Sequence, residues 1–237
     1  MHEMTRIYLG SLLVEEPVTG FTDLIAGGTG LVCFTILIQM KALKEDQRWL
    51  RRYFLFLGIG LCLAGLLGHA FFYATGYNWN YKTIGWTGSA LAVFCLERGT
   101  ILGFRNKLSN SWIQVLLIGQ VIKLLIFFYL ISYPNPGSFE FVKANTAIGI
   151  GGIVLIGQGI LYRMDKIEGR LFIVGGVLFG VLTALVYNNQ ITLNKWFNYH
   201  DISHLMTAIS IFIMFTGVRK ILQDSLGQEG DRVLKFQ

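Results

Sequence analysis

Seven long apolar stretches dominate this sequence. They cover residues 21–40, 53–75, 83–104, 112–132, 139–162, 171–187 and 199–222. Because an α-helix rises 1.5 Å per residue, about 20 apolar residues cross the hydrocarbon core of a membrane. The polar segments between the stretches are too short to separate two folded units. The sequence therefore predicts an all-α membrane protein, a single bundle of seven transmembrane helices.

The composition supports the same class. Hydrophobic residues make up 53% of the chain and charged residues only 14%, against about 25% charged residues in an average soluble domain. This balance excludes a disordered chain, a disulfide scaffold and a coiled coil. The three cysteines all lie within apolar stretches, so we expect free thiols.

The basic residues predict the orientation. Of the 20 lysines and arginines, 14 fall on one side of the bundle and 4 on the other, and Arg98 and Lys123 lie within stretches. Basic loops face the cytoplasm, so the amino terminus is expected outside and the carboxy terminus in the cytoplasm. The net charge of +6 is then a topology signal, and no nucleic-acid partner is expected.

This orientation divides the chain into three parts. Residues 1–20 form an external segment without the features of a cleaved signal peptide, residues 21–222 the membrane domain, and residues 223–237 a cytoplasmic tail. The protein is expected to be a multi-pass integral membrane protein, in the cell membrane if its source is bacterial.

Many of the 28 glycines lie within the stretches. Examples are Gly149, Gly151, Gly152, Gly175, Gly176 and Gly180. Small residues let membrane helices pack closely, and this interpretation is preferred to a phosphate-binding loop because no strand precedes these glycines.

A few ionisable residues lie within or at the edge of the apolar stretches. They are Asp23, His69, Glu97, Arg98, Lys123, His200, Asp201 and His204. Such groups are costly in lipid, so each is a functional candidate. Glu97 and Lys123 could pair between neighbouring helices, and a structural pair is favoured over an ion pathway. The seventh stretch has its only lysine, Lys220, at its cytoplasmic end, which argues against a retinal Schiff base.

Three histidines share one layer of the predicted bundle. His69 and His204 both lie roughly 8–10 Å below the outer boundary, and His200 and His204 are four residues apart on one helix face. This spacing suits two ligands of one zinc ion, with a third histidine from another helix. The alternatives are separate histidines hydrogen-bonded to neighbouring helices and, less favoured, a bis-histidine haem.

With these features the chain resembles the CREST superfamily of membrane hydrolases. That superfamily includes the alkaline ceramidases, the progestin and adipoQ receptors and the haemolysin III-like proteins. The resemblance rests on seven stretches, one histidine late in the second, and H-x-x-x-H opening the seventh. It implies that His69, His200 and His204 bind zinc, and the external amino terminus is similar to that of the ceramidases.

Two positions depart from the pattern of that superfamily. Its members have a serine four residues before the first histidine and an aspartate beyond it, whereas this chain has Gly65 and Asn80. Asparagine cannot accept a proton from water. We therefore expect Asp23 or Asp201 to replace the missing carboxylate.

The resemblance to ceramidases also implies a calcium site near the first stretch. Its acidic residues here would be Glu15, Glu16 and Asp23.

The chemistry implied is hydrolysis of a lipid amide or ester. Zinc on three neutral histidines lowers the pKa of its water to about 7 and polarises a carbonyl. The alternative is a non-catalytic metal-binding protein that acts as a receptor, a sensor or a subunit of a membrane complex. A carboxylate within reach of the water would favour the enzyme. A transporter is disfavoured because no broken-helix site is apparent at the midplane. The expected partners are membrane lipids and, for the alternative, other membrane subunits.

Overall fold

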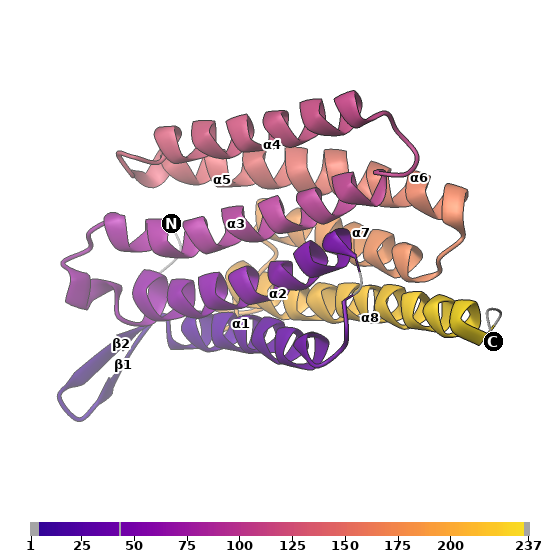
Figure 1. The fold of residues 1–237 in the computed structure, drawn as a ribbon. Coiled ribbons are helices and arrows are strands. Elements are labelled where there is room, and N and C mark those ends of the chain that lie inside the picture. Colours follow the sequence, from indigo (N-terminus) through magenta and orange to yellow (C-terminus); the bar gives the residue numbers. More distant parts are fainter. Residues whose placement is uncertain (1–4, 43, 235–237) are drawn as a thin grey trace.

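The computed structural model describes residues 5–42 and 44–234. Helices that run roughly side by side form one bundle, and a two-stranded hairpin projects from one end of it (Figure 1). Helices α4, α5 and α6 lie on one side of the bundle and α1 and α8 on the other. The candidate histidines lie near the end from which the hairpin projects.

The elements are, in chain order, β1 (Arg6–Leu9), β2 (Leu12–Glu15), α1 (Pro17–Ile38), α2 (Glu45–Leu63), η1 (Ala64–Ala70), η2 (Phe72–Thr75), α3 (Asn80–Gly103), α4 (Asn110–Leu130), η3 (Pro136–Ser138), α5 (Phe139–Thr146), η4 (Ala147–Leu155), α6 (Ile156–Asp165), α7 (Gly169–Asn188) and α8 (Tyr199–Leu234). Several consecutive elements are segments of one continuous helix, such as α2 with η1 and α5 with η4 and α6. The segments η1 and η4 are π-helical, and η2 and η3 are 3₁₀ turns.

Six helices of the described chain are long and apolar enough to cross a membrane. They are Pro17–Ile38, Glu45–Ala70, Asn110–Leu130, Pro136–Asp165, Gly169–Asn188 and Tyr199–Leu226. The prediction of an all-α, membrane-type fold is confirmed at this level. The predicted count of seven is not met, because α3 falls short on composition. This helix has 24 residues but carries Lys82, Glu97 and Arg98.

The ends of several helices differ from the predicted ranges. Helix α1 begins at Pro17 rather than at residue 21, with the proline in the first turn, where its missing N–H costs nothing. Helix α8 continues to Leu234 through most of the predicted tail. The hairpin was not predicted, although two short apolar runs separated by Gly10 and Ser11 are its usual signal; Gly10 takes a positive φ of 66°.

The apolar core lies among α1, α2, α3, α7 and α8. Its fully buried side chains include Leu37, Leu50, Phe54, Leu96, Ile173, Met214 and Leu222. Outside this core, the surfaces of α4 and α7 expose many large apolar side chains, as expected for helices that face lipid.

Glycines bring several helix pairs into close contact. A Cβ on Gly27 of α1 would stand 2.8 Å from the carbonyl of Gly58 on α2, and Gly60 of α2 packs directly on Gly88 of α3. Gly169 and Gly217 do the same between α7 and α8. These contacts confirm that glycines serve helix packing in this fold.

The six glycines singled out in the sequence differ in their surroundings. A Cβ on Gly180 would make an ordinary contact with Ser210, and one on Gly175 would just reach Ile213. Gly149 packs against Val93 and Glu97, and Gly176 against Met214, as predicted. A Cβ on Gly151 or Gly152 would meet nothing within 4 Å, and for these two the packing prediction is wrong.

The predicted pair between Glu97 and Lys123 is confirmed. The ammonium of Lys123 on α4 lies 2.7 Å from the fully buried carboxylate of Glu97 on α3. Lys123 also donates a 2.9 Å hydrogen bond to the side chain of Asn145 on α5, and Gln120 donates to Glu97 at 3.4 Å. Three helices are thus joined by one buried polar network.

Candidate functional site

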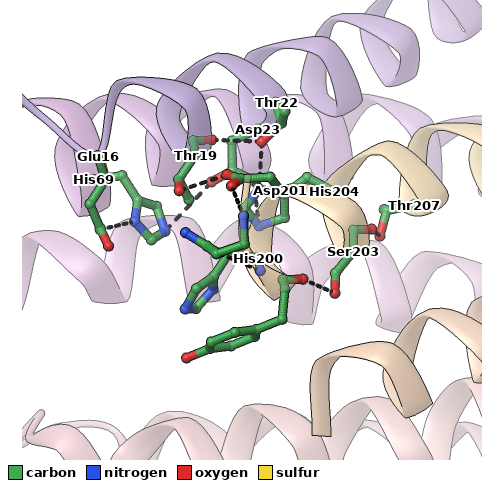
Figure 2. Close-up of polar contacts among 12 residues, drawn as sticks. Glu16, Thr19, Thr22, Asp23, His69, His200, Asp201, Ser203, His204 and Thr207 are labelled. Atoms are coloured by element: carbon green, nitrogen blue, oxygen red, sulfur yellow. Dashed lines mark hydrogen bonds and ion pairs between the residues drawn. The ribbon is translucent and has the colours of Figure 1, made fainter. Parts of the chain in front are cut away.

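The structure brings together the three histidines expected from the sequence. His69 comes from η1, and His200 and His204 from the first two turns of α8. Their ring centroids are 5.7 Å apart for His69 and His200, 6.1 Å for His69 and His204, and 6.3 Å for His200 and His204. Figure 2 shows the three rings grouped beside the first turns of α1.

Local structure sets the position of each ring. The pair on α8 shares a face because residues four apart lie one above the other on a helix. His69 lies in a π-helical turn, in which an extra residue per turn changes the direction of the side chains that follow. Such turns are frequent at functional sites, and the sequence gives little signal for them.

Asp23 of α1 lies between two of the histidines. Its Oδ1 is 3.3 Å from Nε2 of His204, and its Oδ2 is 3.8 Å from Nε2 of His69. The residue is 2% exposed, and Oδ1 has no hydrogen-bond partner among the described residues. A buried carboxylate oxygen without a donor is costly.

The opposite ring nitrogens of these two histidines have partners of their own. Nδ1 of His69 is 2.8 Å from the carboxylate of Glu16, and Nδ1 of His204 is 3.2 Å from the hydroxyl of Thr22. The Thr22 hydroxyl donates its proton to the carbonyl of Thr19, so it accepts from His204. We assign the Nδ1–H tautomer to both rings from these partners.

This tautomer has an electrostatic consequence at the centre of the cluster. Each Nε2 then presents a lone pair toward the carboxylate of Asp23, which is itself rich in electrons. Two lone pairs and an unsatisfied carboxylate oxygen repel one another unless a proton or a metal cation lies among them. The donor set is also the one that zinc prefers, with each Nδ1–H held by an outer partner.

The side chains are more widely spaced than a closed metal site requires. Among the described residues, no group of three His, Cys, Asp or Glu side chains is close enough to hold one ion as it stands. With nitrogens about 2.0–2.1 Å from a shared zinc ion, simple geometry places imidazole centroids about 5–5.5 Å apart. The observed separations exceed this value by less than about 1.5 Å, which rotation of the rings can supply.

Glu16 adopts an uncommon backbone conformation where it meets His69. Its φ of 42° and ψ of 53° lie in the left-handed region, which is unfavourable for a residue with a side chain. Burial by itself raises the pKa of Glu16, but the hydrogen bond from His69 and the electrostatic interactions with His69, His200 and Lys82 lower it by more. Glu16 is therefore held as a carboxylate that orients the ring of His69.

Asp201, the other candidate acid–base residue, is engaged in hydrogen bonds with α1 and with the residue before α8. Its Oδ1 accepts a 2.7 Å hydrogen bond from Thr19 and its Oδ2 a 2.6 Å bond from the backbone N–H of Asn198. The side chain is completely buried and fastens the start of α8 to α1. Asn80 is exposed at the start of α3 and forms no hydrogen bond with a described histidine. Of these three candidates, only Asp23 contacts the cluster.

The absence of a side chain at Gly65 is explained by Asp23. A Cβ on Gly65 would stand 2.7 Å from Cβ of Asp23 and 2.8 Å from the carbonyl oxygen of Gly20. A serine does not fit there while Asp23 is in place.

The acidic residues proposed for calcium do not gather at one point. The carboxylate of Glu15 forms an ion pair with Arg6 at 3.1 Å and accepts a 2.8 Å hydrogen bond from the hydroxyl of Tyr77. The hydrogen bond to Glu15 raises the pKa of Tyr77. Glu16 and Asp23 instead share His69. The calcium site stays a prediction that the structure does not test.

A large apolar cavity opens from the histidine cluster. Its volume is about 820 Å³, and its lining includes all three histidines and Asp23 at one end and Tyr53 and Met214 deeper in the bundle. From His200 to Met214, helix α8 rises by about 20 Å. The sequence did not reveal this cavity, because its walls come from helices whose rotations hydropathy does not specify.

Comparison with known proteins identifies a family. A family model for DUF6962, described as a family of unknown function, matches residues 18–223. No curated protein and no solved structure matches the chain. The matched range reaches into every described helix, although α1 begins one residue before it and α8 continues beyond it. It includes His69, His200, His204 and Asp23 but not Glu16. The chain therefore belongs to the DUF6962 family.

Proposed function

We propose that this protein is a zinc-dependent hydrolase of a membrane lipid amide or ester. The observation that carries the proposal is the arrangement at Asp23, where two histidine lone pairs and an unsatisfied carboxylate oxygen converge at one end of a long apolar cavity. A cation relieves the repulsion among these groups, and the cavity suits an acyl chain.

His69, His200 and His204 are the proposed metal ligands. Zinc supplies a Lewis acid that polarises a carbonyl and lowers the pKa of water. Glu16 and Thr22 hold the outer nitrogens of His69 and His204, which keeps both Nε2 atoms deprotonated and directed inward.

Asp23 is the proposed general base. Its carboxylate lies between the two Nε2 atoms, where it can take a proton from an attacking water and deliver it to the leaving group. It would replace the carboxylate that the resembled hydrolases have at the position of Asn80. This carboxylate is also what favours the hydrolase over a non-catalytic receptor, sensor or subunit, for which no proton acceptor is needed.

The proposed topology places this site in the outer leaflet. Helix α3, with 24 residues, is long enough to be the seventh span, and its charges are accommodated inside the bundle by pairs such as Glu97 with Lys123. With the basic loops in the cytoplasm, the hairpin, the cluster and the mouth of the cavity lie on the external side. A lipid in the outer leaflet of the cell membrane would then present its headgroup linkage at the depth of the histidines.

Metal analysis of the purified protein tests the proposal. The wild type is expected to contain close to one zinc ion per chain and the His204→Ala variant almost none, whereas His2→Ala, which changes the remaining histidine, keeps its zinc. The same samples are then incubated with ceramides and lysolipids. Zinc-free wild type, or a full lipid panel that survives intact with zinc-loaded protein, would contradict the hydrolase.

A further inference from the structure

One cation that lines the cavity, Lys82, has no anionic partner bound to it among the described residues. Lys82, in the first turn of α3, lines the same cavity as the histidines. Within the described part of the chain its ammonium forms neither a hydrogen bond nor an ion pair. It lies 4.5 Å from the ring centroid of Phe72 and 4.6 Å from that of Trp79, and the two rings hold it in place.

Lys82 lies close to the proposed reaction centre. Its Cγ is 4.0 Å from the position that a Cβ on Gly68 would take, and Gly68 precedes His69 in η1. Glu16 is near enough to act on the ammonium electrostatically, but the Glu16 carboxylate is bound to Nδ1 of His69. The positive charge of Lys82 is therefore available to a molecule in the cavity.

A second lysine of the cavity provides a contrast. Lys143 on α5 also lines it, but its ammonium is 2.6 Å from the carboxylate of Glu140 one turn away. Its charge is already balanced. The two lysines share a cavity and differ in whether an anion is bound, so only Lys82 is expected to select a ligand.

We propose that Lys82 makes the cavity selective for acyl lipids with an anionic headgroup, whose phosphate or carboxylate binds the ammonium while the acyl chain fills the apolar interior. This inference rests on the proposed function for the identity of the site but concerns the substrate class. A lysine acts as a point charge, so phosphate and carboxylate satisfy it by the same chemistry. Charge-assisted hydrogen bonds contribute more than neutral ones.

Binding to the full-length protein in nanodiscs of neutral lipid tests this selectivity. Three probes share one dibrominated C18 chain and differ in headgroup: the free fatty acid, the lysophosphatidic acid and the neutral monoacylglycerol. Bromine quenches Trp79 and Trp86, which line the cavity. We expect the better anionic probe to bind about tenfold or more tightly than the neutral probe, and the tighter of the two anionic probes identifies the headgroup source.

Variants separate the role of Lys82 from general effects. Lys82→Met should remove most of the tenfold preference, Lys82→Arg should retain it, and Lys143→Met should leave it within about twofold of the wild type. Unfolding temperatures show whether each variant is folded. If Lys82→Met does not fold, the retained preference of Lys82→Arg still tests whether the positive charge is responsible. A preference that survives Lys82→Met, or is lost equally in Lys143→Met, would overturn the inference.

The zinc content of the same samples distinguishes this inference from the proposed function. The binding assay needs no turnover, so a charge preference that depends on Lys82 in zinc-free protein would leave the inference standing and reject the metal site. Zinc-loaded protein without any preference for anionic probes would reject the inference alone.

Discussion

Asp23 occupies the space that a side chain at residue 65 would need: a Cβ on Gly65 would lie 2.7 Å from the Cβ of Asp23. The two residues come from different helices, α1 and η1. Because of this contact, residue 65 has no room for the serine that the resembled hydrolases carry while Asp23 is in place.

Gly65→Ser should therefore destabilise the protein. The new Cβ would also stand 2.8 Å from the carbonyl of Gly20, and overpacking of this kind costs about 1–3 kcal/mol. Thermal unfolding in detergent measures the loss. Gly28→Ser is the control, because a Cβ on Gly28 of α1 meets nothing within 4 Å. Equal stability of the two variants would contradict the close contact at Gly65.

If the proposed hydrolase is correct, Asp23→Asn should reduce its turnover of lipid by about 10²–10⁴-fold while the fold persists, because the amide keeps the shape of the side chain and removes the proposed base. Asp201→Asn should instead lower the unfolding temperature, since Asp201 accepts hydrogen bonds from Thr19 and Asn198. Turnover and thermal unfolding are measured on both variants. A reversed pattern, with activity lost in folded Asp201→Asn alone, would assign the base to Asp201.

At the proposed zinc site, Thr22→Val should weaken metal binding by about 10–100-fold, the usual effect of removing an outer partner of a ligating histidine. The hydroxyl of Thr22 holds Nδ1 of His204 at 3.2 Å. Titration with a competing chelator measures the affinity. In the control, Thr29→Val, the lost hydroxyl bonds only to the backbone of Ile25 on the same helix, and zinc affinity should match the wild type.

Removal of one partner from the Glu97–Lys123 pair should cost about 3–5 kcal/mol of stability, because the other charge is left buried. Glu97→Gln and Lys123→Met test each side, and the double variant should recover a large part of the loss. Unfolding free energies for this cycle give the coupling directly. If both single variants are neutral, the pair does not stabilise the helix packing.

A cysteine at Asn78, an exposed residue before α3, should react with an impermeant thiol reagent on intact cells. A cysteine at Asn106, in the exposed turn after α3, should react only after lysis. The two positions flank one helix and must lie on opposite sides if α3 crosses the membrane. Labelling of both on intact cells would exclude α3 as a span.

The sequence predicts the parts of this structure that depend on local composition. Long apolar stretches identify the helices, and the spacing of His200 and His204 with the depth of His69 brings three rings into one layer. The partners of these rings could not be foreseen, because they depend on how α1 is rotated and how closely it approaches η1. Asp23 and Asp201 are therefore both candidates for the base in the sequence, where Asp201 points about 100° from His200 and more naturally serves a neighbouring helix. In the structure Asp23 lies 3.3 and 3.8 Å from the Nε2 atoms of His204 and His69, whereas Asp201 accepts hydrogen bonds from Thr19 and Asn198.

Two features, the π-helical turn of His69 and the charges carried by α3, share a physical origin. The π-helical turn of His69 shifts the helix face by about one residue, which a hydropathy pattern does not reveal. Helix α3 is long enough to span a membrane, but its charged side chains need partners on other helices. Lys123 and Gln120 of α4 supply such partners for Glu97. Tertiary context decides these features.

The hairpin has a mechanical consequence for the histidine cluster. Glu15 and Glu16 are consecutive, yet Glu15 is bound to Arg6 and Tyr77 outside the bundle and Glu16 to His69 inside it. Because one peptide bond joins the two residues, a tilt of the hairpin would also displace the backbone of Glu16, whose carboxylate is bound to His69. The tip of the hairpin is exposed, with Tyr8 72% and Leu9 62% accessible. A contact made at this tip would therefore act at a distance on the position of the His69 imidazole.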